Sequence, residues 1–169
     1  FTSSDQGPTS SANAARLYRY SYDGTYSLDS GFPVLVNNSK SETLTIAKDG
    51  AGKLWITWVE DDRVKVNRSV GDDLTWGTPF DIPGQSGDVE PDDISVITSL
   101  DGGIGVMWSD QTTDDKSIYF NIHNDGDPDT QWQGREAALQ DPDLGSVADD
   151  HINLKPTCDS DGNIYAVIK

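Results

Sequence analysis

Three segments of the chain repeat one pattern: an alternating strand, a turn rich in Asp and Gly, and a second alternating strand. They span residues 44–58, 94–108 and 152–167. Alternation of apolar and polar side chains indicates strands with one buried face, and glycine supplies the positive φ that tight hairpin turns require. Each segment is therefore predicted to form a β-hairpin, called here an A–B hairpin.

A second kind of hairpin, called C–D, falls between these segments. It is predicted over residues 18–36, 64–82 and 118–132. Trp76 and Trp132 sit just after the turns of the second and third copies, and Tyr26 is the cruder equivalent in the first. The chain then runs C–D, A–B–C–D, A–B–C–D, A–B, with a repeat of about 50 to 60 residues. A four-stranded antiparallel unit of that length is typical of β-propeller blades.

The predicted fold is therefore all-β, a β-propeller of about three blades. A β-sandwich is the alternative, but a sandwich has no reason to repeat its turn chemistry and tryptophan positions at blade length. Residues 1–15 are expected to be a flexible leader or linker, and residues 16–169 a partial propeller domain. Because closed rings need about four to eight blades, the ring is expected to be completed by further blades of the same chain or by a second copy.

The charge balance limits the kinds of partner. The chain has 12 basic and 29 acidic residues, a net charge of −17. That field repels phosphate backbones and anionic lipids, so nucleic acid is not expected as a partner. No apolar run approaches 18 residues, so no membrane insertion is expected. Cys158 is the only cysteine, which excludes a disulfide framework within the chain.

The turn after the second C strand carries a recognisable motif. In residues 69–76, Ser69, Thr75 and Trp76 stand in register with the Asp-box, while its central acidic position is displaced to Asp72 and Asp73. The segment resembles the Asp-box of sialidase-like, BNR-repeat β-propellers. That resemblance implies an extracellular or cell-surface protein, and it implies that these residues fix a turn and take no part in catalysis.

The resemblance also sets an expectation for enzymatic activity. Catalysis in sialidases uses three arginines that grip a carboxylate, a tyrosine paired with a glutamate, and an aspartate. The five arginines here are Arg16, Arg19, Arg63, Arg68 and Arg135, and none begins an A strand. The leading hypothesis is therefore a glycan- or protein-binding module or a structural surface element. The alternative is a sialidase-like glycoside hydrolase whose catalytic residues lie largely in other blades.

Acidic residues precede the A strands and fill the B–C loops, which a propeller brings to one face. The weak catalytic candidates there are Asp92, Asp93, Asp149, Asp150 and His151. The ligand-binding candidates are Glu42, Asp61, Asp62, Asp149, His151 and Lys155. Paired carboxylates at such a mouth could ligate Ca²⁺ or act as acid and base in glycoside cleavage. They could equally cap strands and bind loop amides.

Two further groups of residues carry expectations. Asp125, Asp127 and Asp129 place oxygens at alternating positions, like the first half of a calcium loop, although the Gly and Glu of an EF-hand are missing. Calcium is the only cofactor these residues indicate. The tryptophans of the B strands, Trp55, Trp58 and Trp108, are expected in the core between blades, with a sugar-stacking platform as the alternative. His123 is expected at a surface turn.

Overall fold

The described part of the chain folds entirely into strands and turns. The computed structural model describes residues 2–3, 14–39, 41–85, 87–112, 117–139, 152–156 and 162–168, and it contains no helix there. The paired strands run antiparallel throughout. The all-β, antiparallel prediction is confirmed. The described strands do not close into a ring.

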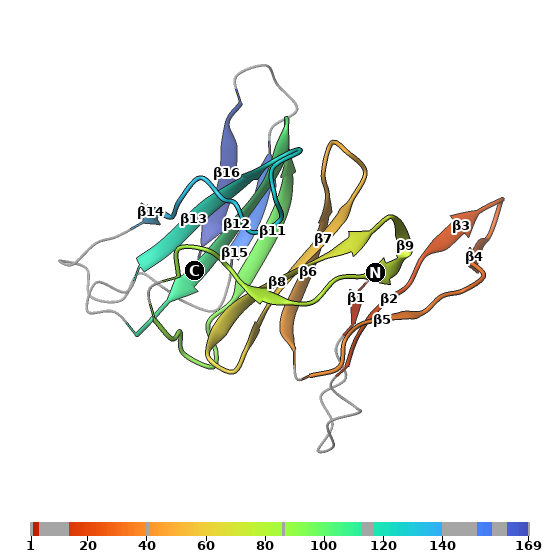
Figure 1. Cartoon of the computed structure of the whole chain (residues 1–169), viewed down its shortest axis with the longest axis horizontal. Coiled ribbons are helices and arrows are strands. Elements are labelled where there is room, and N and C mark those ends of the chain that lie inside the picture. Colours follow the sequence, from red (N-terminus) through yellow and green to blue (C-terminus); the bar gives the residue numbers. More distant parts are fainter. Residues whose placement is uncertain are drawn as a thin grey trace.

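The described strands form four successive sheets, joined in chain order, and a separate two-stranded hairpin that adjoins the first of them (Figure 1). The first sheet holds β1 (Thr2–Ser3), β2 (Ala15–Leu17) and β5 (Val34–Asn37), and the hairpin of β3 (Tyr20–Tyr22) and β4 (Tyr26–Leu28) continues from it. The second sheet holds β6 (Glu42–Lys48), β7 (Leu54–Glu60) and β8 (Arg63–Val70), with β9 (Asp72–Trp76) and β10 (Phe80–Asp81) both paired to β8.

The third sheet holds β11 (Ser95–Leu100), β12 (Gly103–Asp110), β13 (Ser117–Asn124) and β14 (Glu136–Leu139). The fourth holds β15 (Ile152–Pro156) and β16 (Ile164–Ile168). The second and third sheets thus each place four strands side by side. All three predicted A–B hairpins are present, as β6–β7, β11–β12 and β15–β16. Between β11 and β12 the turn consists of Asp101 and Gly102 alone, and Gly102 adopts the expected positive φ of 80°.

The first two predicted C–D hairpins lie within their predicted ranges, whereas the outer strand of the third lies beyond residue 132, and one main-chain hydrogen bond recurs in all three. The amides of Asp29, Gly77 and Gln133 donate to the carbonyls of Arg19, Arg68 and Ile122, each over 2.9 Å. The residues just before these donors, Leu28, Trp76 and Trp132, are therefore equivalent. Tyr26 was the wrong equivalent, because the first turn is spaced differently. The outer strand of the third hairpin, β14, begins only at Glu136, after Trp132.

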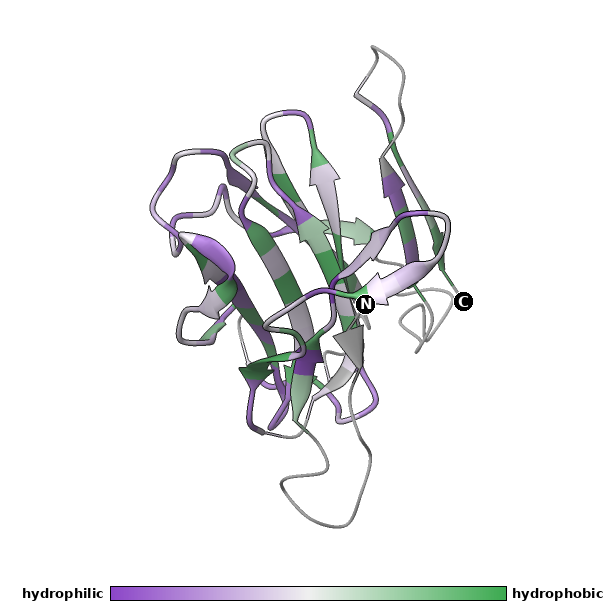
Figure 2. Ribbon diagram, turned by 90° about the vertical axis from the view of Figure 1, so that its right-hand side faces the viewer, coloured by the Kyte–Doolittle hydropathy of each residue, from purple (hydrophilic) through white to green (hydrophobic). Residues whose placement is uncertain are grey.

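Each sheet packs its faces on the sheets before and after it. Leu17 and Val36 of the first sheet meet Ile56 and Trp58 of the second. Met107 and Ile118 of the third sheet meet Leu154 of the fourth. Figure 2 shows hydrophobic residues along the strands and hydrophilic residues in the connecting loops.

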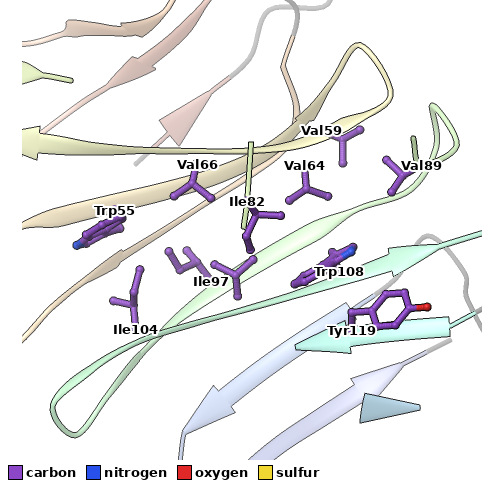
Figure 3. Close-up of a cluster of buried hydrophobic side chains, with 11 residues drawn as sticks. Trp55, Val59, Val64, Val66, Ile82, Val89, Ile97, Ile104, Trp108 and Tyr119 are labelled. Atoms are coloured by element: carbon purple, nitrogen blue, oxygen red, sulfur yellow. The ribbon is translucent and has the colours of Figure 1, made fainter. Parts of the chain in front are cut away.

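The joint between the second and third sheets is the largest of these clusters. Trp55 and Val66 of the second sheet face Ile104 and Trp108 of the third (Figure 3). Because successive side chains of a strand point to opposite faces, Trp55 and Trp58 of β7 enter the joints on either side of their sheet. Trp55, Trp58 and Trp108 are completely buried. The core interpretation of these tryptophans is confirmed, and the stacking-platform alternative is wrong for them.

The first strands of three sheets lie side by side. β6 lies against β11, and β11 against β15. Thr45 Oγ1 of β6 accepts a hydrogen bond from Ile97 N of β11 over 3.0 Å, and Ser99 Oγ donates to Lys48 O over 2.7 Å. We call β6, β11 and β15 the inner strands.

The leader predicted over residues 1–15 lies largely outside the described residues. Within it, Thr2–Ser3 form β1, which pairs with β2, and β2 itself begins at Ala15.

Candidate functional site

Three connecting segments of the second and third sheets meet at one end of the strands, and we call them the rim: residues 60–63, 87–93 and 110–112. Val89 N donates to Asp62 O over 2.8 Å, and Thr112 Oγ1 donates to Asp88 O over 2.9 Å. These bonds join a B–C turn, the loop entering an inner strand and the next B–C loop. The predicted site residues Asp61, Asp62, Asp92 and Asp93 therefore lie at the same end of the second and third sheets.

Asp93 braces the rim from inside. Its side chain is almost fully buried and accepts hydrogen bonds from Ser109 Oγ (2.6 Å), Glu90 N (2.8 Å) and Gln111 N (3.0 Å). A buried carboxylate held by three hydrogen bonds is a structural acceptor. Its neighbour Asp92 is exposed, and among the described residues it has a long 3.5 Å contact with Gln111 Nε2.

Asp61 and Asp62 form the tip of the turn after β7. Both have positive φ, 50° and 59°, a conformation that aspartate tolerates better than most residues, and both are exposed. The side chain of the adjacent Arg63 forms ion pairs with two other aspartates. Its Nε donates to Asp81 over 3.1 Å, and its Nη1 donates to Asp88 over 3.4 Å. The two aspartates at the tip therefore face solvent, and Arg63 ties the turn to its surroundings.

A concavity of about 430 Å³ runs along the inner strands. It is lined by Leu44, Thr45, Ile46, Val96, Ile97, Ile152, Asn153, Leu154 and Lys155. Its six aliphatic residues also pack into the clusters between sheets, and Thr45, Asn153 and Lys155 are its polar members. Asn153 and Lys155 are exposed, and Lys155 is the only charged residue among those that line it. The structure thus places one predicted ligand-binding residue, Lys155, on a hollow surface.

The structure says less about the other residues predicted to bind a ligand or to act in catalysis. Glu42 begins β6, where its backbone pairs with Val59 of β7. Asp149, Asp150 and His151 lie outside the described residues, as does Cys158.

The loop predicted to bind calcium lies at the opposite end of the strands. Asp129 receives Lys53 Nζ over 2.8 Å and Arg68 Nε. Burial alone would raise the pKa of Asp129, but the hydrogen bonds from Lys53 and Arg68 prevail and lower it. Asp129 is therefore an anion already neutralised by two cations.

The other carboxylates of that loop do not complete a metal site. Asp127 Oδ2 accepts a hydrogen bond from Asn124 Nδ2 over 3.0 Å. Across the described ranges, no three His, Cys, Asp or Glu side chains come together as metal ligands. The calcium hypothesis for Asp125, Asp127 and Asp129 gains no support from this arrangement.

The turn that resembles an Asp-box is held by side-chain to backbone hydrogen bonds. Asp72 Oδ1 accepts from Thr75 N (2.8 Å) and Leu74 N (2.9 Å), and these bonds lower the pKa of Asp72. Ser69 Oγ accepts from Leu54 N over 3.0 Å, and the ring of Trp76 packs against the cluster between the first and second sheets. These residues have a structural role.

Two arginines at equivalent positions link neighbouring sheets, a role the sequence did not reveal. Arg19 Nη1 donates to Asp73 of the second sheet over 3.0 Å, and Arg68 of that sheet pairs with Asp129 in the turn of the third. Both aspartates lie in C–D turns. Aligning the C strands would have shown the recurring arginines, but not their partners, because the ion pairs cross between sheets.

Two buried asparagines make a second recurring link. Asn67 Nδ2 donates to Val36 O of the first sheet over 3.2 Å, and Asn121 Nδ2 donates to Pro83 O, just after β10, over 2.8 Å. Ile56 pairs with Asn67 as Val106 pairs with Asn121, so the two positions are equivalent. Asn is the fourth residue of the predicted C strands that begin at Val64 and at Ile118. This shared position is the feature of the sequence that could have indicated a common role for Asn67 and Asn121.

The arginines do not converge on a common point. Arg19, Arg63 and Arg68 form ion pairs at three separate places, and Arg135 lies 4.0 Å above the ring of Tyr119. His123 is buried, with its ring 4.6 Å from that of Trp55, so the surface position expected for it is wrong.

Comparison with protein-family models and with curated proteins found no match, so the functional argument rests on the chain's own residues. The described residues include no helix long and apolar enough to cross a membrane.

Proposed function

We propose that the chain forms consecutive blades of a β-propeller and serves as an extracellular or cell-surface binding module. Three features support the propeller. The sheets repeat one hairpin order, each packs face to face on its neighbours in sequence, and the inner strands β6, β11 and β15 lie side by side. Blades arranged around an axis have all three features. The resemblance of residues 69–76 to the Asp-box of sialidase-like propellers is part of the proposal.

The ligand is proposed to be a glycan with a single carboxylate that meets the local positive charge of Lys155, although the net charge of −17 disfavours polyanions. The observation behind this is the concavity of the inner strands, whose volume of about 430 Å³ suits a small ligand. The aliphatic residues leave part of its surface apolar, which suits the apolar face of a sugar ring. Asn153 offers hydrogen bonds to hydroxyl groups, and Lys155 offers a charge-assisted bond to a carboxylate.

The alternative, a sialidase-like glycoside hydrolase, draws no support from the described residues. Asp93 is saturated with hydrogen bonds, and Arg19, Arg63 and Arg68 form ion pairs at separate places. We therefore place binding ahead of catalysis.

Calorimetric titration with sialylated and matched neutral oligosaccharides tests this function. Wild-type protein should prefer the sialylated glycan, and Lys155→Met should weaken that binding about tenfold, the loss expected for one charged hydrogen bond. Lys48→Met is the matched control, because Lys48 is an exposed lysine at the end of β6 that does not line the concavity. Equal binding by wild type and Lys155→Met, or no glycan binding at all, would refute the proposal. Release of free sialic acid would favour the hydrolase.

A further inference from the structure

Two tryptophans at equivalent positions of the second and third sheets differ in one hydrogen bond. Trp58 lies two residues beyond Ile56 and Trp108 two beyond Val106, positions that the buried asparagines align. Both tryptophans are completely buried. Trp58 Nε1 donates to Glu60 Oε2 over 2.7 Å, whereas Trp108 Nε1 has no hydrogen-bond partner in the described part of the chain. A buried indole N–H normally has an acceptor, so the acceptor for Trp108 has to be identified.

A second buried polar group without a partner lies on the neighbouring strand. Ser117 of β13 pairs with Asp110 of β12, two residues along from the pair of Tyr119 with Trp108. Cross-strand partners, and residues two apart along one strand, share a face of the sheet. All four residues therefore face the second sheet, and the rings of Trp108 and Tyr119 lie there with centroids 5.7 Å apart (Figure 3). The Ser117 hydroxyl is buried, and no described residue forms a hydrogen bond with it.

Asp110 adds an acceptor to these two groups. Its side chain is almost fully buried, and Thr112 N and Thr112 Oγ1 donate to its Oδ1 over 3.1 Å and 2.7 Å. Among the described residues, none donates to its Oδ2. Asp110 is the equivalent of Glu60, because each lies two residues beyond the aligned tryptophan. Asp110 is one methylene shorter than Glu60, which accounts for the missing direct bond to Trp108 Nε1.

The third sheet has the smaller side chains around its tryptophan. Glu60 pairs with Arg63 in the second sheet, as Asp110 pairs with Ser117 in the third. Both exchanges remove side-chain atoms from the face that Trp108 occupies. The Trp108 site, formed by Trp108 Nε1, Asp110 Oδ2 and Ser117 Oγ, therefore has room for a small molecule.

The chemistry of the three groups selects that molecule. It has to accept a hydrogen bond from an indole N–H and to donate one to a carboxylate. The N–H repels a metal ion, and the carboxylate of Asp110 repels an anion. Water meets both requirements, and a buried water molecule typically makes about three hydrogen bonds to polar groups that lack other partners.

We infer that the Trp108 site binds one buried water molecule between the second and third sheets. The water accepts from Trp108 Nε1, donates to Asp110 Oδ2 and exchanges its third hydrogen bond with Ser117 Oγ. It does for the third sheet what Glu60 does for the second, which is to satisfy a buried tryptophan. The inference depends on the packing of these two sheets alone and is independent of ring closure and of the glycan.

Water-selective ROESY of the ¹⁵N-labelled chain tests the inference. Trp108→Phe and Trp58→Phe each remove one of the five indole N–H signals and so assign the two that matter. In wild type, the Trp108 indole proton should show a water cross-peak with the sign of a dipolar contact, which is opposite to that of proton exchange. The Trp58 indole proton is the matched control and should show none, because it is equally buried and donates to Glu60. A Trp108 indole proton without a dipolar cross-peak to water overturns the inference.

Two further variants separate bound water from other sources of the signal. Ser117→Ala removes the only hydroxyl of the Trp108 site, and the cross-peak should persist because the water keeps its other two partners. Loss of the cross-peak in Ser117→Ala would show transfer through the hydroxyl proton and would overturn the inference. Asp110→Glu should bond Trp108 directly, as Glu60 bonds Trp58, and so abolish the cross-peak while the ¹⁵N spectrum stays dispersed. A cross-peak of wild-type strength in Asp110→Glu would contradict the assignment of the site.

Discussion

At the scale of single residues, polar side chains fix how neighbouring sheets are placed. Arg19 and Arg68 reach aspartates in the next sheet, and Asn67 and Asn121 reach carbonyls of the preceding one. Apolar packing has no direction, so it brings sheets together without fixing their offset. Hydrogen bonds at equivalent positions specify that offset. The buried amide of Asn67 is also closed to glycosylation, although it stands in an Asn-Arg-Ser sequon.

The ion pairs of Asp129 predict a pH dependence of stability. Because the folded pKa of Asp129 is lowered, its pairing with Lys53 and Arg68 contributes fully above the unfolded value of about 4 and is lost as the pH falls through the folded pKa. The free energy of unfolding of wild type should exceed that of Asp129→Asn at neutral pH. Guanidinium unfolding at a series of pH values should show the two curves converging below about pH 4. A difference that persists unchanged into acid would contradict this account of the site.

At the scale of elements, the close approach of β12 and β13 depends on a missing side chain. A Cβ at Gly103 would lie 2.3 Å from the carbonyl oxygen of His123, which belongs to the neighbouring strand. Gly103→Ala must therefore move backbone, and it should lower the free energy of unfolding by about 1–3 kcal/mol. Gly87→Ala is the matched control, since nothing lies near its Cβ position. Equal stability of the two variants in urea titrations would show that β12 and β13 are not held as described.

The elements themselves were largely predictable, because alternation and turn chemistry are local. Each predicted A–B hairpin lies where residues 44–58, 94–108 and 152–167 placed it. The C–D hairpins were harder. Their long turns hid the equivalence of Leu28 with Trp132, which only the recurring main-chain hydrogen bond reveals.

The candidate site was less predictable than the fold, since side-chain partners come from distant segments. An exposed Asp61 and a saturated Asp93 look alike in sequence, yet one faces solvent and the other braces a loop. Asp129 was predicted to meet calcium and meets Lys53 and Arg68, which precede it by many residues. His123 was assigned to the surface because nothing local shows that Trp55 covers it.

Across the whole molecule, the sheets pack on one another in the order in which they follow along the chain. The first sheet meets the second, the second meets the third, and the third meets the fourth. A row of sheets packed in this order, with its inner strands adjacent, is the arrangement that the proposed propeller requires. A sandwich would instead fold distant sheets onto one another in two layers.

Methyl and aromatic NOE spectroscopy of the selectively labelled chain tests this order most directly. The account predicts cross-peaks between Leu17 and Trp58, and between Met107 and Leu154, because each pair belongs to one cluster between successive sheets. It predicts none between Leu17 of the first sheet and Val106 of the third. Cross-peaks that join the first and third sheets directly would contradict the propeller arrangement.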